Sequence, residues 1–296
     1  MNYTGEIAGL ATAICWTATA MSFQIASRRI GSVSVNLIRL VFAFIFYLIY
    51  SKIFLNQWLP LDAPLKAWIY LSISGLIGFV LGDYFLFKSY EYISSKISML
   101  IMTLAPPVAA ILGWFMMGER FTWMNALGMF LVIFGVSLVI AKKDVENGVK
   151  SRRYPVKGLV FAFLGAIGQG VGAVFSKIGM GDYDPFASSQ IRVITGVIGF
   201  TIMISVMKRW KIVARGAIDK KASKALLIGS FFGPFLGVSL GMVAFKFTTV
   251  GIASTLMATV PVFILIPSHL ILKEKLTINE VIGAFFAVAG IALFFM

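Results

Sequence analysis

The sequence predicts an all-α integral membrane protein with ten transmembrane helices in two inverted five-helix repeats. Three observations carry this prediction. Hydrophobic residues make up 59% of the 296 residues and charged residues only 13%, whereas soluble domains contain about 25% charged residues. The apolar residues gather in long stretches between short polar segments. The two halves of the chain also share one pattern of prolines, glutamates and glycines.

Ten apolar stretches are long enough to cross a bilayer, which needs about 20 residues per helix. Lipid offers no partners to backbone N–H and C=O groups, so each stretch is expected to be a helix. The first stretch lacks the basic start of a secretory signal, and we expect it to be a true membrane helix. The stretches cover residues 6–27, 33–54, 66–88, 93–117, 122–141, 157–178, 186–208, 224–246, 250–272 and 277–296.

A constant offset relates the two halves of the chain. It pairs Pro106, Glu119, Thr122, Gly128 and Gly135 with Pro261, Glu274, Thr277, Gly283 and Gly290. We assign residues 1–141 to the first repeat, 142–156 to a polar linker and 157–296 to the second repeat. Each repeat holds five spans, an odd number, so the copies have opposite orientations in the membrane. Such inverted repeats place a substrate site near the bilayer midplane, between the copies.

The basic residues indicate orientation rather than nucleic-acid binding. The net charge is +14, but Lys and Arg gather in short loops between the apolar stretches, mainly those after odd-numbered helices. The positive-inside rule then puts these loops in the cytoplasm and both termini outside. One cysteine, Cys15, and one histidine, His269, leave no intrachain disulfide and no zinc cluster. We expect neither a metal nor a cofactor.

A series of short motifs resembles the EamA-type repeat of the drug/metabolite transporter superfamily. The first half shows Gly82–Asp83–Tyr84, Leu104–Ala105–Pro106 and Gly118–Glu119–Arg120, and the second shows Val260–Pro261 and Lys273–Glu274–Lys275. The resemblance implies ten helices in two inverted repeats and the export or exchange of small metabolites, including amino acids. It also implies cytoplasmic termini, opposite to the loop charges. The glutamate that cation exporters carry in the first helix is missing here, where Cys15–Trp16 occupies the centre.

Ionisable residues inside the spans are candidates for function because they are costly in lipid. Asp83 has Val238 at its repeat-related position, so it is a candidate for proton coupling or for binding a substrate amine. The alternative is an ion pair with Lys88 or Arg39. Arg39 and Arg192 occupy matching positions, and we interpret them as structural charges that reach the headgroups or pair with an acid.

Prolines and neutral polar groups complete the candidate site. Pro106 and Pro261 lie near the centres of helices 4 and 9, where each is either a hinge or a packing kink. A serine or threonine in a helix often bonds its own backbone instead of a ligand. The predicted substrate-binding residues are Trp16, Gln24, Asp83, Tyr84, Thr103, Gln169, Ser176, Ser254 and Thr255.

The sequence therefore favours a secondary transporter that exports or exchanges a small polar metabolite by alternating access. Its expected partners are this solute and the lipid bilayer, with no nucleic acid, and a monomer suffices because the repeats supply their own interface. We expect it in the plasma membrane of a prokaryotic cell. The alternatives are an integral membrane enzyme, which the scattered acids disfavour, a non-transporting scaffold, and a channel.

Overall fold

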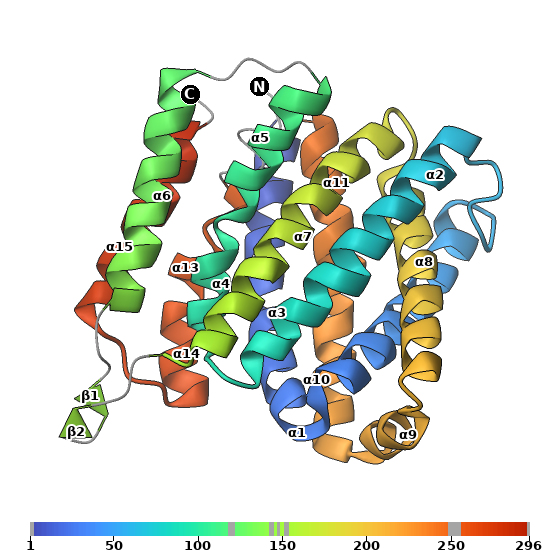
Figure 1. Ribbon diagram of the computed structural model, residues 1–296. Helices are drawn as coiled ribbons and strands as arrows, with labels where there is room; N and C mark the ends of the chain where they lie inside the picture. Colours follow the sequence, from blue (N-terminus) through green and yellow to red (C-terminus); the bar gives the residue numbers. More distant parts are fainter. Residues whose placement is uncertain are drawn as a thin grey trace.

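The computed structural model describes residues 3–117, 122–141, 145–146, 149–150, 154–247 and 256–294. These residues form a bundle of helices with one short antiparallel hairpin, in which β1 (Val145–Glu146) pairs with β2 (Val149–Lys150). Figure 1 shows both termini at one end of the bundle and the hairpin at the other. The predicted all-α membrane fold is confirmed.

The first half of the chain begins with one long helix that turns back on itself. This helix, α1, holds the first two predicted spans and reverses at Gly31, which has φ 76° and ψ 154°. A positive φ costs little only for glycine, so Gly31 marks the reversal. α1 spans Thr4–Phe54. The helices that follow it are α2 (Leu65–Ser74), η1 (Gly75–Gly82), α3 (Asp83–Tyr90), α4 (Ser95–Met102), α5 (Ala105–Met117) and α6 (Trp123–Ala141).

The second half repeats this order in separate helices. Its helices are α7 (Val156–Met180), α8 (Pro185–Val206), α9 (Trp210–Ile218), α10 (Lys220–Ser230), η2 (Phe231–Gly237), α11 (Val238–Phe247), α13 (Val260–Phe263), α14 (Leu265–Leu272) and α15 (Ile278–Phe294). α9 is a short addition between the second and third spans of this half. Residues 250–255 of the predicted ninth span lie outside the described residues.

The helices of the described ranges account for ten passes. Six helices or helical runs are long and apolar enough to cross a membrane, and three shorter apolar helices cover residues 126–139, 260–272 and 278–293. Since α1 supplies two passes, the total is ten, five before the linker and five after it. In Figure 1, α1 starts from the end that holds the termini, whereas α7 runs toward that end. The two halves are therefore inverted.

The third helix of each half contains a wide π-helical segment that the sequence did not predict. η1 (Gly75–Gly82) and η2 (Phe231–Gly237) lie at repeat-related positions. Pro234 in η2 cannot donate a backbone hydrogen bond, and the Tyr47 hydroxyl lies 2.9 Å from its carbonyl oxygen. π-Helical turns are rare and are frequent at functional sites.

Glycines allow the two halves to approach closely. A Cβ atom on Gly168 of α7 would lie 2.6 Å from the Cα of Gly82, and one on Gly172 would lie 2.9 Å from the Cα of Gly78. Small residues permit such close packing of membrane helices. The fifth helices, α6 and α15, likewise pack side by side through repeat-related glycines at one edge of the bundle (Figure 1).

The end of the bundle opposite the termini carries many of the basic residues. α9 lies there (Figure 1) and is joined to the reversal of α1 by the Arg29–Asp219 ion pair, at 2.8 Å. Asp219 also accepts a hydrogen bond from the N–H of Ala222 at the start of α10. These two interactions, first with Arg29 and then with Ala222, lower the pKa of Asp219 to about 2. The loop charge that predicts the cytoplasmic side is thus concentrated on the α9 end.

Candidate functional site

A cavity of about 250 Å³ lies between the two repeats. Its wall is formed by the first four passes of the first half and by the corresponding passes of the second half, whereas α6 and α15 do not contribute. Most of the wall is apolar, with a few polar side chains. This combination is typical of small-molecule sites.

The structure brings most of the predicted site residues to this cavity. Trp16, Asp83, Thr103, Gln169 and Ser176 line it, together with both prolines and both arginines. Gln24 and Tyr84 do not line it. Ser254 and Thr255 lie outside the described residues. Whether the lining residues bind a solute stays a prediction.

A buried ion pair stands at the centre of the cavity wall. Arg39 Nη2 donates to Asp83 Oδ2 at 2.6 Å, and the two side chains are only 3% and 9% exposed. Asp83 Oδ1 accepts a hydrogen bond from Gln169 of α7, which also donates to the carbonyl of Gly78. Of the alternatives for Asp83, the structure shows the ion pair with Arg39, and Lys88 instead pairs with Glu91. The Asp83–Gln169 bond joins the two repeats.

Hydrogen bonds and aromatic rings surround the Arg39 side chain. Its Nε donates to Asn36 Oδ1 at 3.2 Å, and its guanidinium lies 4.8 Å from the centre of the Phe87 ring and 5.7 Å from that of Phe79. Asn36 in turn donates to the carbonyl of Asp83 at 3.4 Å. The expectation that Arg39 pairs with an acid is met.

Arg192 is held differently from its repeat partner. It is 7% exposed and lines the same cavity, and its guanidinium lies 4.5 Å from the centre of the Phe79 ring. Its Nε has no hydrogen-bond acceptor within the described ranges. The ion pairs of those ranges do not include it. The interpretation of Arg192 as a structural charge therefore stays a prediction.

Both predicted hinge prolines stand at breaks in their helices. α4 ends at Met102 and α5 starts at Ala105, directly before Pro106. Pro261 lies in the first turn of α13, and this helix is separate from α14. The breaks agree with a proline that lacks a donor and clashes with the preceding turn. Movement at these positions stays a prediction.

The hydroxyl groups of the cavity wall are already bonded to the protein. Thr103 donates to the carbonyl of Leu100 at 2.6 Å, which is the backbone bond expected as an alternative to ligand binding. The Ser176 hydroxyl lies 2.9 Å from that of Ser74, which donates to the carbonyl of Gly172. These hydroxyls shape the wall, and the ionisable groups remain its main polar feature.

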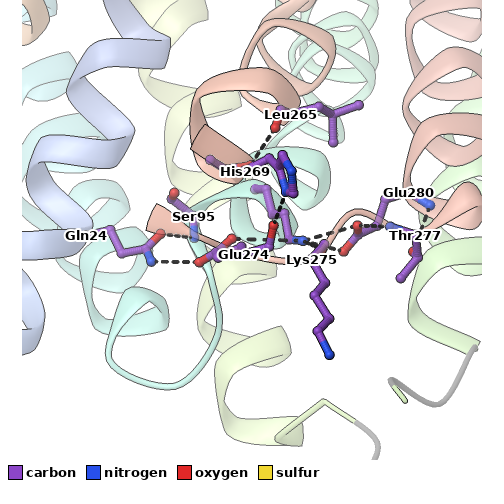
Figure 2. Close-up of polar contacts among 10 residues, drawn as sticks. Gln24, Ser95, Leu265, His269, Glu274, Lys275, Thr277 and Glu280 are labelled. Carbon is purple, nitrogen blue, oxygen red and sulfur yellow. Dashed lines mark hydrogen bonds and ion pairs between the residues drawn. The ribbon is translucent and has the colours of Figure 1, made fainter. Parts of the chain in front are cut away.

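Gln24 belongs to a polar network outside the cavity wall (Figure 2), near the reversal of α1 at the α9 end of the bundle. Its amide oxygen accepts from the N–H of Ser95 at 2.5 Å and its amide nitrogen donates to Glu274 at 3.0 Å. Lys96 continues the network, at 3.0 Å from Glu280 and 3.9 Å from Glu274. Since α1 and α4 belong to the first repeat and both glutamates to the second, the network ties the repeats together.

Lys96 and Glu280 are almost fully buried in this network. They are 8% and 3% exposed, respectively, and Lys96 also donates to the carbonyl of Lys275 at 2.6 Å. Glu280 caps its own helix by accepting from the N–H of Thr277 at 2.9 Å. The sequence analysis gave no role to Lys96 or Glu280. Figure 2 shows Gln24, Glu274 and Glu280 in this network.

The comparisons with known proteins agree with this architecture. The sequence profile of the "EamA-like transporter family" matches residues 3–141 and, a second time, residues 156–296. This chain belongs to the EamA-like transporter family. It is therefore a multi-pass membrane transporter, and the family indicates transport rather than an enzymatic activity.

Several relatives of this EamA-family protein are also named as transporters. An uncharacterized transporter of Archaeoglobus fulgidus is 24% identical over 73% of this chain and 74% of its own length. The uncharacterized transporter YyaM of Bacillus subtilis is 25% identical over 76% of this chain and 71% of its own length. An uncharacterized membrane protein of Saccharomyces cerevisiae is 31% identical over 118 residues, which span 38% of this chain and only 27% of the yeast protein.

A solved crystal structure has the same fold. It covers 99% of this chain and 96% of its own, with a TM-score of 0.64 and 15% sequence identity. At this identity the likeness concerns the fold alone. In the ranges described for the EamA-family chain, no group of three or more His, Cys, Asp or Glu side chains is placed to hold a metal ion.

Proposed function

We propose that this EamA-family protein is a secondary transporter that exports or exchanges a small polar metabolite, such as an amino acid or a related compound, by alternating access. The observation that carries the proposal is the cavity between the inverted repeats, with Arg39, Asp83 and Arg192 in its wall. Charged groups within a membrane span mark solute or ion pathways. Inverted repeats place such pathways at their interface.

The polar network around Lys96 supports a gate at the α9 end. Gln24, Glu274, Lys96 and Glu280 join the repeats outside the cavity wall. In an alternating-access cycle these bonds break when the cavity opens toward the α9 end. Their polar character favours this role, because separated charges can be solvated once water enters the open gate.

The fifth helices support the movement without taking part in binding. α6 and α15 pack against each other and stand outside the cavity wall. We propose that they brace the bundle while the first four passes of each repeat rock around the site. A monomer in the plasma membrane of a prokaryotic cell is sufficient for this cycle.

Counterflow in proteoliposomes tests the proposal. Purified protein is reconstituted with a mixture of unlabelled amino acids inside, and uptake of each labelled amino acid is measured. Saturable uptake that depends on internal solute supports a carrier, and uptake without saturation indicates a channel. Asp83→Asn and Gln169→Ala should change the flux, since both side chains line the cavity. Normal flux in both variants would remove these residues from the site.

A further inference from the structure

Arg192 is a buried cation that the described part of the chain leaves unpaired. Only 7% of the residue is exposed, and it lines the cavity. Its Nε is enclosed without an acceptor, and its guanidinium lies over the face of the Phe79 ring. Burying an unpaired charge is costly, and buried charges are normally paired. The wall is thus incomplete without a negatively charged partner for Arg192.

The two repeats differ at the position that would supply this partner. In the first repeat, Arg39 of α1 binds Asp83 at the start of α3. The offset that relates the repeats matches Arg192 with Arg39 to within a few residues and Val238 with Asp83. Val238 lines the cavity. The second repeat therefore has the arginine but has an apolar residue where the first has a carboxylate.

The charges of the cavity wall favour a solute with one negative charge. In the described ranges the wall has three charged side chains, Arg39, Asp83 and Arg192, with a net charge of +1. Asp83 is already engaged by Arg39 through one oxygen and by Gln169 through the other. A substrate ammonium group would find no free carboxylate here. A carboxylate, in contrast, matches the planar fork of donors that an arginine presents.

The apolar residues of the cavity wall favour a solute that is mostly apolar apart from its negative charge. The cavity is lined by Trp16, Phe23, Phe79, Phe87 and Phe245, as well as methionine side chains. Aromatic rings and thioethers give contact area to apolar and aromatic groups. The wall thus has one anion-binding point and a large apolar surface.

Building on the proposed transport function, we infer that Arg192 binds the carboxylate of a monocarboxylate solute whose apolar body packs against the aromatic wall. This narrows the solutes of the proposed function to an apolar monoanion, that is, a compound related to an amino acid but without the ammonium group, in preference to a cation or a zwitterion. Arg39 stays the structural arginine of the pair, because its guanidinium is already satisfied by Asp83 and Asn36.

Four matched probes test the inference by calorimetric titration of the protein in nanodiscs. They are phenylacetate, its neutral amide phenylacetamide, the cation phenethylamine and the zwitterion L-phenylalanine. Phenylacetate should bind most tightly. Arg192→Gln should weaken the binding of phenylacetate by about ten-fold or more, since a charge-assisted bond is lost. The same substitution should leave the affinity for phenylacetamide unchanged. The control Arg215→Gln, at an exposed position of α9, should alter neither of these two affinities.

Val238→Asp gives a second test if Arg192→Gln folds poorly. It gives the second repeat a carboxylate at the position that Asp83 occupies in the first repeat, and it should weaken the binding of phenylacetate. Val238→Asn should not weaken this binding. The inference is overturned if phenethylamine or phenylalanine binds more tightly than phenylacetate, if phenylacetate does not bind, or if neither Arg192→Gln nor Val238→Asp weakens it. Counterflow of labelled phenylacetate and of labelled amino acids is measured separately. Binding of phenylacetate without counterflow of either solute would contradict the transport function, whereas counterflow of amino acids without binding of phenylacetate would contradict the substrate class.

Discussion

Replacing Asp83 by asparagine removes one charge of the buried Arg39–Asp83 pair while keeping acceptor and donor groups of nearly the same shape. Arg39 Nη2 and Asp83 Oδ2 are 2.6 Å apart, and both side chains are almost fully enclosed. Two opposite charges about 4 Å apart attract by about 4 kcal/mol at an effective dielectric constant near 20. Breaking a buried pair by removing one partner costs about 3–5 kcal/mol. We expect Asp83→Asn to lose stability on this scale.

This loss is large compared with the stability of most proteins, about 5–15 kcal/mol. One kcal/mol shifts the unfolding temperature by about 2–4 °C in proteins of 150–250 residues, so the expected decrease is on the order of 10 °C. Cys15 is the one cysteine of the chain and is 6% exposed. A fluorogenic thiol reagent therefore reports unfolding of the detergent-solubilised protein from a single site.

Asp219→Asn is the matched control, because Arg29–Asp219 is also an Arg–Asp pair but its side chains are 43% and 26% exposed. Exposed pairs contribute little, and asparagine also caps helices, so the unfolding temperature should stay near that of the wild type. Arg39→Met combined with Asp83→Leu should recover much of the stability lost in Asp83→Asn. Equal unfolding temperatures of Asp83→Asn and Asp219→Asn would refute the reasoning.

Three further predictions concern packing, the π-helical segment and orientation. Gly168→Ala places a methyl group 2.6 Å from the Cα of Gly82, so overpacking should lower the free energy of unfolding by about 1–3 kcal/mol in the thiol assay; an unchanged value would mean that the repeats separate there without cost. Tyr47→Phe removes the hydroxyl that bonds Ser239 and the carbonyl of Pro234, and we expect a loss of about 1–3 kcal/mol by the same measurement; no loss would show that the π-helical segment does not need it. A reporter fused to the C-terminus, active only outside the cytoplasm, should be active because the basic loops lie at the opposite end; activity of a cytoplasmic reporter instead would favour the orientation that the family resemblance implies.

The sequence predicted the ten passes and the inverted repeats because these depend on span length and on the offset between prolines and glycines. It also predicted that Asp83 is unusual, since Val238 stands at the matching position. In the described ranges the ends of the helices agree with the predicted spans within a few residues, apart from the added α9 and the long α1; the start of the ninth span lies outside these ranges.

The candidate site could be predicted only in part because a span fixes the depth of a residue but not the direction of its side chain. Gln24 lies outside the cavity wall and Tyr84 packs beside the main core cluster, although both are polar residues within apolar spans. The π-helical segments depend on contacts between distant helices, such as that of Tyr47 with η2. The difference between Arg39 and Arg192 could be inferred from Val238, but only once the first repeat shows that Arg39 binds Asp83.

Access to the cavity from each face tests the central claim most directly. A single reporter cysteine, Ala173→Cys in the cavity wall, is introduced into a Cys15→Ala background. Proteoliposomes of known orientation are then treated with a membrane-impermeant maleimide on one side at a time. Alternating access predicts labelling from both faces without passive ion leak.

Adding Lys96→Met should shift this labelling toward the α9 face, because the gate then loses its bonds to Glu280 and Lys275. Labelling that stays confined to one face, with and without this substitution, would contradict a cavity that opens alternately between the two repeats.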